Sequence, residues 1–174
     1  MGLSIAISGG IVTFSIVYAM MSFPAIVDDT TKISTSESQM TNNQFLRMQT
    51  NISMANLQDQ NNGGPASFQI TNTGNIVLWN YNDFDVIITY QENATNNPMR
   101  TEILKYASSC SGLSSDQWCI SHIQNDNIHP GFLDPNEIAT ISAQPAHQTN
   151  MGGVFTVEFG TDTGVTTSNS VIIS

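Results

Sequence analysis

An uncharged N-terminal segment constrains what this chain can fold into more than any other feature. No Asp, Glu, Lys or Arg occurs from Leu3 to Val27, and the acidic pair Asp28-Asp29 ends this run. About 20 apolar residues are enough to cross a bilayer as a helix. The sequence therefore predicts an N-terminal transmembrane anchor over residues 1–27, and it places the function in the polar chain that follows.

Two other interpretations of this segment stay open. A cleaved secretory signal has a basic start, an apolar core of roughly 7–15 residues and a cleavage site of small residues. Here no Lys or Arg precedes the run, and the run is longer than such a core. A buried helix of a soluble domain is the other alternative, because serines, threonines and the pair Gly9-Gly10 make the run only moderately apolar. We expect a retained helix in preference to both.

The chain as a whole is strongly acidic. It has 14 Asp or Glu and only four Lys or Arg among 174 residues, which gives a net charge of -10. Nucleic acid is excluded as a partner, because neutralising phosphates requires a basic surface. So few positive residues leave the positive-inside rule almost nothing to act on. We place the large domain outside the cell because of this acidity, two neighbouring cysteines and two glycosylation sequons.

Cys110 and Cys119 are predicted to form a disulfide, with two free thiols as the alternative. The flexible Ser-Gly-Leu-Ser-Ser stretch between them lets them meet, and disulfides persist in oxidising compartments. The sequons for N-glycosylation lie at Asn51 and Asn93. Such a short pattern also arises by chance in an Asn-rich chain, so each is only a possible glycosylation site.

The periodicity of apolar residues changes along the chain. Residues 28–60 carry apolar side chains near helical spacing, which predicts a helical stalk that continues the anchor. Gly-Gly-Pro within residues 60–65 marks a boundary that a helix does not cross. From there the pattern alternates, with turn residues about every 8–12 positions, which predicts an all-β antiparallel sandwich of the immunoglobulin-like class over residues 61–174. The expected strands are 66–71, 84–90, 99–106, 118–123, two within 131–141, 153–159 and 164–173. Turns are expected at Asn72-Thr-Gly74 and at Asp134-Pro-Asn-Glu137.

No standard catalytic pattern occurs in the sequence. It lacks a Gly-x-Ser-x-Gly elbow, a phosphate-binding loop, a dinucleotide fingerprint and a His-Glu-x-x-His pair. His122 and His129, with Asp126 between them, match no standard spacing of metal ligands, and His147 lies far from both. Asp126, Asp134 and Glu137 do not fit the EF-hand calcium loop. We therefore expect a chain that is not an enzyme and that uses no metal or cofactor.

Three segments resemble a known family: Phe68–Gly74, Phe84–Tyr90 and Leu133–Thr140. Together with the Met-Gly-Leu-Ser start, the uncharged helix and the polar stalk, they resemble accessory proteins F and G of the archaeal flagellum (archaellum), F more than G. The cysteine-containing segment, residues 107–127, departs from this pattern, and we expect it to be an insertion with contacts of its own.

The resemblance implies a stator component of the archaellum motor. The helix would be a single pass in the cell membrane, and the sandwich would lie in the pseudoperiplasm. There it would bind the surface-layer protein lattice or a partner accessory protein, with a homo-oligomer also possible. The family offers no catalytic residues. Two other functions stay open: a pilin-like filament subunit, whose precursors carry a basic leader that this sequence lacks, and a membrane-anchored module that binds an envelope component.

Overall fold

The computed structural model describes residues 2–59 and 64–174, without the side chains of residues 2–8 and 22–36. Two compact units divide the chain, residues 1–44 and residues 45–174. The first unit is helical. The second contains the last turn of that helix and all the strands.

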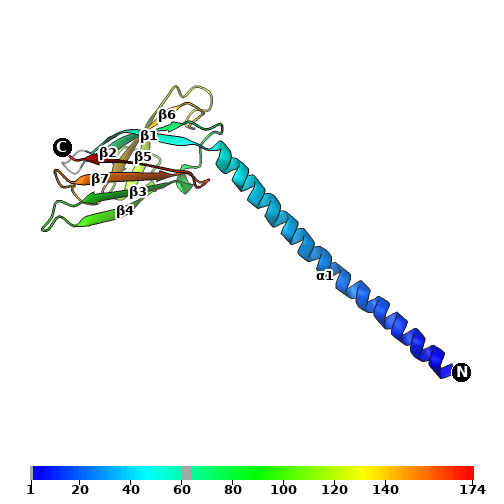
Figure 1. Ribbon diagram of the computed structural model, residues 1–174. Helices are drawn as coiled ribbons and strands as arrows, with labels where there is room; N and C mark the ends of the chain where they lie inside the picture. Colours follow the sequence, from blue (N-terminus) through cyan, green and yellow to red (C-terminus); the bar gives the residue numbers. More distant parts are fainter. Residues whose placement is uncertain (1, 60–63) are drawn as a thin grey trace. The chain divides into compact units, whose positions relative to one another are not determined.

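A single long helix, α1, runs from Gly2 to Gln49 (Figure 1). Its polar side chains in the uncharged run bond to the helix itself: the hydroxyl groups of Thr13 and Ser15 donate to the carbonyl groups of Gly9 and Ile11, at 2.8 and 2.9 Å. A Ser or Thr hydroxyl within a helix can bond in this way to the carbonyl four residues earlier. Between residues 9 and 21 the apolar side chains are exposed, including Phe14 at 72%.

The predicted transmembrane anchor over residues 1–27 lies partly outside the residues whose side chains are described. Within the described part of the chain, no helical stretch has both the length and the apolar character needed to span a bilayer. The anchor therefore stays a prediction.

The prediction of a helical stalk over residues 28–60 is wrong at its C-terminal end. The helix ends at Gln49, and strand β1 occupies Ile52–Gln58. Ile52 and Leu57 are buried in the sandwich, and β1 pairs with its neighbour from Ile52↔Asn72 onward. Tertiary pairing thus outweighs the local helical spacing, which is a weak signal where Asn and Thr are frequent. The predicted boundary at residues 60–65 falls largely outside the described residues.

The remaining strands agree closely with the alternating pattern. One expected strand is missing, because residues 131–137 form a turn that makes only an isolated bridge between Leu78 and Leu133. A short 3-10 helix, η1, covers Tyr81–Asp83. The other strands are β2 (Ala66–Asn72), β3 (Asp85–Gln91), β4 (Met99–Tyr106), β5 (Gln117–Gln124), β6 (Ile138–Gln144), β7 (Val154–Gly160) and β8 (Thr166–Ile172).

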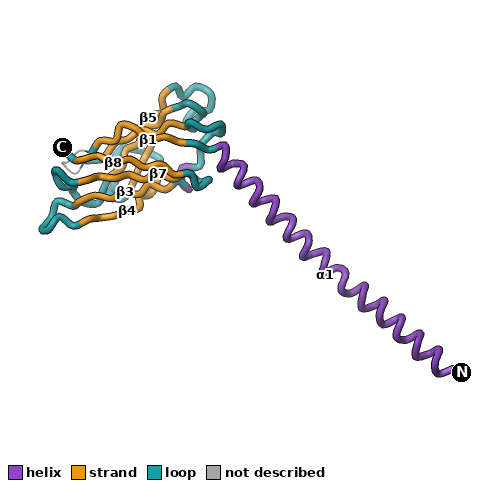
Figure 2. The backbone as a smooth tube through the Cα atoms, in the orientation of Figure 1, coloured by secondary structure: helices purple, strands orange, loops and turns teal. Residues whose placement is uncertain are grey.

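The strands form a two-layered sandwich with the order β1-β2-β6-β5-β4-β3-β7-β8. The first four strands and the last four have the order of the two sheets of an immunoglobulin-type domain. All pairs are antiparallel except β4–β5, which is parallel over Lys105↔Gln117 and Tyr106↔Trp118. The pairing is parallel because residues 107–116 carry the chain back before β5 begins, so β5 runs in the same direction as β4. This short pairing joins the two layers. At the other end β1 and β8 lie side by side (Figure 2).

Aromatic side chains from both layers fill the core. Trp118 of β5 is fully buried, with its ring centroid 4.9 Å from Tyr106 and 5.9 Å from Phe159 of β7. Phe159 also contacts Phe68 of β2, at 6.3 Å. Each such burial stabilises the fold by about 1.5–3 kcal/mol. This aromatic core joins the two layers.

Candidate functional site

The last turn of α1 enters the sandwich without a flexible linker. Only Thr50 and Asn51 separate Gln49 from the first residue of β1. We call the surrounding structure the helix joint, and define it as residues 49–51, 72–75, 133–137 and 161–165. Two of the three segments that resemble the archaellum accessory proteins, Phe68–Gly74 and Leu133–Thr140, contribute to this joint.

Asn72 is the centre of the helix joint. Its side chain is fully buried, and its amide nitrogen donates to the carbonyl oxygens of Ile76 and Leu133, at 2.8 and 2.9 Å. Its side-chain oxygen accepts from the backbone N–H of Gly74 at 3.0 Å. Its own backbone exchanges hydrogen bonds with Asn136 and Glu137, at 2.7 and 3.1 Å. A buried amide with all its groups paired fixes one local arrangement, so Asn72 locks two distant turns together.

The turn after Asn72 holds the end of α1 through its backbone. The N–H of Asn75 donates to the carbonyl of Gln49 at 2.8 Å, and the N–H of Thr73 donates to the carbonyl of Asn51 at 2.9 Å. The first of these bonds satisfies one of the carbonyl groups that a helix end leaves unpaired. At Gly74 a side chain does not fit, because a Cβ there would lie 2.5 Å from the Asn51 nitrogen and the Gln49 oxygen.

The opposite layer of the sandwich holds the same helix end. Thr50 is only 4% exposed, and its hydroxyl donates to the carbonyl of Leu46 at 2.8 Å. It accepts from the hydroxyl of Thr163, in the turn between β7 and β8, at 3.0 Å. Residues from both layers therefore fix the position of the last helical turn.

The acidic turn predicted over residues 134–137 is part of this joint. Asn136 adopts a positive φ of 71°, and the N–H of Asp134 donates to the Glu137 carboxylate at 2.9 Å. The Asp134 carboxylate lies 2.8 Å from the ring Nδ1 of His129. His147 lies elsewhere, 3.4 Å from Glu92, and His122 is exposed on β5. Among the described residues there is no group of three or more potential ligands placed to hold a metal.

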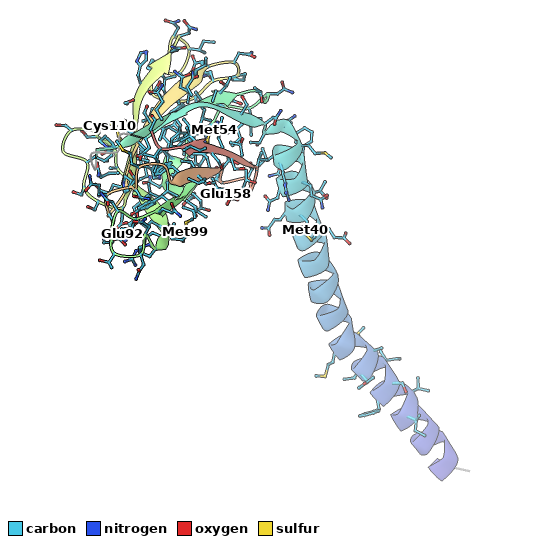
Figure 3. All side chains as sticks on the ribbon, turned by 60° about the vertical axis from the view of Figure 1, so that its left-hand side comes forward. Met40, Met54, Glu92, Met99, Cys110 and Glu158 are labelled. Atoms are coloured by element: carbon cyan, nitrogen blue, oxygen red, sulfur yellow. A yellow bond between two sulfur atoms is a disulfide. The ribbon has the colours of Figure 1, made fainter. Side chains whose placement is uncertain are left out.

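The disulfide and the sequons lie at three separate places. Cys110 and Cys119 are bonded, with their Cα atoms 5.5 Å apart, and they tie residues 107–116 to β5. Asn93 is exposed in the β3–β4 loop, whose two ends are marked by the labels Glu92 and Met99 in Figure 3. Asn51 is exposed at the helix joint. The glycosylation sites remain predictions.

Sequence reasoning recognised both turns of the helix joint but not their contact. Asn72-Thr-Gly74 and Asp134-Pro-Asn-Glu137 each carry ordinary turn residues. The resemblance to one family was the only signal that grouped them, since nothing in the residues themselves pairs Asn72 with Leu133, 61 positions away.

Comparison with solved structures identifies similar folds, although no protein-family profile and no curated protein matches the sequence. The archaeal flagellum of Methanospirillum hungatei strain JF1 is 16% identical, with a TM-score of 0.53, over 100% of this chain and 94% of that chain. The archaellum periplasmic stator protein FlaG from Sulfolobus acidocaldarius is 14% identical, with a TM-score of 0.49, over 70% of this chain and 99% of that chain. The stator complex of FlaF and FlaG from the same organism is 13% identical, with a TM-score of 0.49, over 69% of this chain and 87% of that chain.

At these identities the likeness concerns the fold. The chain shares its fold, over its whole length, with a protein of an archaeal flagellum. The resemblance to archaellum proteins that the sequence predicted is thus confirmed at this level. The similar structures are described as an archaeal flagellum and as archaellum periplasmic stator proteins.

Proposed function

We propose that this chain is a structural component of an archaellum, anchored in the cell membrane by α1, that acts as part of the stator. The helix joint is the observation that carries this proposal. A motor turns a filament only if a fixed body takes up the reaction torque, and a fluid bilayer cannot. The chain would therefore connect a helix in the membrane to a rigid structure outside it.

The construction of the helix joint supports this mechanical role. A flexible Gly/Ser linker behaves as a random coil and would dissipate force. Here three hydrogen bonds hold Gln49, Thr50 and Asn51 against the sandwich. Each contributes about 0.5–1.5 kcal/mol. A load on the end of α1 is thus passed directly to both layers of the domain.

The outward face of the layer β4-β3-β7-β8 supports binding of a protein partner. In its middle, the hydroxyl groups of Thr89 and Thr101 lie 3.0 Å apart, and those of Thr156 and Ser170 lie 2.9 Å apart. Apolar side chains flank this row of hydroxyl groups. The exposed fractions of these side chains are 57% for Met99, 66% for Ile103, 47% for Val154 and 68% for Ile172. Several exposed apolar side chains on one face favour this face as the interaction surface, and the surface-layer protein or a partner accessory protein is the proposed occupant.

A flexible insertion tests the stator role. Inserting Gly-Ser-Gly-Ser between Gln49 and Thr50 keeps both units of the chain but breaks the direct connection. We expect cells with this variant to assemble filaments and to rotate them poorly. The matched control is the same insertion in the exposed β3–β4 loop between Thr95 and Asn96, which should leave swimming nearly unchanged. Normal swimming with the insertion at the joint would contradict the stator function.

The filament itself offers a second candidate function. The similarity to the flagellum of Methanospirillum hungatei covers all of this chain, α1 included. If this chain were a filament subunit, it would be the main protein of sheared, purified filaments. If it is a stator, it should stay in the membrane fraction. Mass spectrometry of both fractions distinguishes the two functions.

A further inference from the structure

A polar pocket lies beside the disulfide, on a part of the domain that the proposed function does not use. Its volume is about 690 Å³, which is within the range of sites that bind small molecules. Three parts of the chain line it. They are the segment 106–108 before the disulfide, the strand β5 with the loop up to Gly131, and Tyr81 of η1.

The walls of this pocket are held in place by the protein itself. The Cys110–Cys119 disulfide fixes the segment that carries Ser108. On the opposite wall, both carboxylate oxygens of Asp126 accept from the N–H of Gly131, at 3.0 and 2.9 Å. The hydroxyl of Tyr81 donates to the carbonyl of Gly131 at 3.1 Å. A preformed site binds more tightly because less ordering is needed when the ligand arrives.

The lining combines aromatic rings with polar groups of several kinds. The rings of Tyr81 and Tyr106 lie 5.7 Å apart, centroid to centroid, and Ile120 and Ile123 extend this apolar part. The polar part consists of hydroxyl, amide, imidazole and carboxylate groups from Ser108, Ser121, Asn125, Asn127, His122 and Asp126. Among the residues that line the pocket there is no Lys or Arg, so a phosphate, sulfate or carboxylate ligand finds no positive charge to pair with.

An exposed aromatic platform is carried by two of the segments that line the pocket. Trp79 is 59% exposed and Phe132 is 42% exposed, with their ring centroids 6.3 Å apart. His129 stacks on Phe132 at 6.4 Å. The two segments that carry this platform also reach the pocket, through Tyr81 and Gly131. A large exposed aromatic surface next to a polar pocket calls for a ligand with both apolar faces and many hydrogen-bonding groups.

We propose that the pocket binds a neutral saccharide, one ring within the pocket and the next on the Trp79–Phe132 platform. A pyranose ring has an apolar C–H face that packs on aromatic side chains. Its hydroxyl groups both donate and accept, as the lining requires. The absence of cationic side chains in the lining selects against uronic acids and sugar phosphates. This inference does not depend on the proposed archaellum function.

Titration of the full-length chain in detergent with neutral sugars tests the inference. The probes are di- and trisaccharides of glucose, mannose, galactose and N-acetylglucosamine. Their binding is measured by isothermal titration calorimetry and by saturation-transfer NMR. We expect at least one neutral trisaccharide to bind. His122→Ala with Asn125→Ala should weaken that binding at least tenfold. Trp79→Ala should weaken trisaccharide binding more than disaccharide binding.

Matched controls keep the test specific. Gln124→Ala alters an exposed residue of the same strand outside the pocket and should leave the affinity unchanged. Thermal unfolding of each variant shows whether the fold is kept. Three results would overturn the inference: no binding by any neutral sugar of the panel, tighter binding of glucuronate or putrescine than of every neutral sugar, or binding that survives the double substitution unchanged.

Discussion

Replacing Gly74 by alanine tests whether the helix joint is as tightly built as the structure indicates. The added Cβ would lie 2.5 Å from the backbone nitrogen of Asn51, 2.5 Å from the backbone oxygen of Gln49 and 3.2 Å from the carbonyl carbon of Thr50. All three neighbours are backbone atoms, so no side-chain rotation can relieve the contact. The turn or the end of α1 has to move.

The expected cost follows from two contributions. Overpacking of a tight site costs about 1–3 kcal/mol. The movement would also lengthen the hydrogen bonds Asn75–Gln49 and Thr73–Asn51, now 2.8 and 2.9 Å, each with a net value of about 0.5–1.5 kcal/mol. We therefore expect Gly74→Ala to lower the free energy of unfolding by about 2–6 kcal/mol. That is a large share of the roughly 5–15 kcal/mol by which a domain is stable.

Urea unfolding followed by tryptophan fluorescence measures this cost. Both tryptophans of the chain, Trp79 and Trp118, lie in the sandwich, so the signal reports on that unit. Gly160→Ala is the matched control, because its Cβ would meet its nearest neighbour, the Thr166 methyl group, at an ordinary 3.5 Å. If Gly74→Ala changes the stability by less than 1 kcal/mol, or by no more than Gly160→Ala does, the argument from close backbone packing is refuted.

Three further predictions concern other parts of the sandwich. Removing the disulfide with Cys110→Ser and Cys119→Ser opens a loop with a sequence separation of 9, and should cost about 2–3 kcal/mol in urea unfolding; a loss below 0.5 kcal/mol would show that the loop is held by other contacts. Tyr90→Phe removes a hydroxyl of a fully buried residue that donates to Glu102 at 2.6 Å and accepts from the N–H of His147 at 3.1 Å. This substitution should lower the free energy of unfolding by about 1–3 kcal/mol. Unchanged stability would argue against these two hydrogen bonds. Burial raises the pKa of Asp59 above its ordinary 3.8, against a lowering by its hydrogen bond with Thr149. The folded state then binds the proton more tightly, so the ionised carboxylate destabilises the fold at a pH above its raised pKa, and this cost disappears as the pH falls through that pKa. Asp59→Asn should therefore raise the free energy of unfolding at pH 7, with a gain that shrinks toward pH 4. A gain that does not depend on pH would contradict this assignment.

The sequence by itself determined the local elements wherever the periodicity was long and clear. The uncharged run and the residues after it form one continuous helix up to Gln49. The alternating segments became strands, and the boundaries of β4, Met99–Tyr106, agree with the prediction to the residue. Side-chain periodicity is a local property, because it reflects which face of an element is buried.

Tertiary structure decided the elements for which local signals were weak or misleading. Residues 52–58 have near-helical apolar spacing, yet they form β1 because β2 offers a partner strand and a place to bury Ile52 and Leu57. The parallel contact between β4 and β5 likewise depends on how residues 107–116 cross between the layers. Pairing between distant segments is not encoded in the period of either segment.

The helix joint and the pocket were decided by tertiary structure alone. The residues from Asn72 to Gly74 predict an ordinary turn. The hydrogen bonds of this turn region with Gln49 and with Leu133 form only when β2 and β6 are neighbours. His122 and Asp126 were set aside as metal ligands, and folding places them in one polar lining with Tyr81, which is 41 positions or more away in sequence. A binding site needs groups that converge in space, and the chain brings them together only through the packing of its two layers.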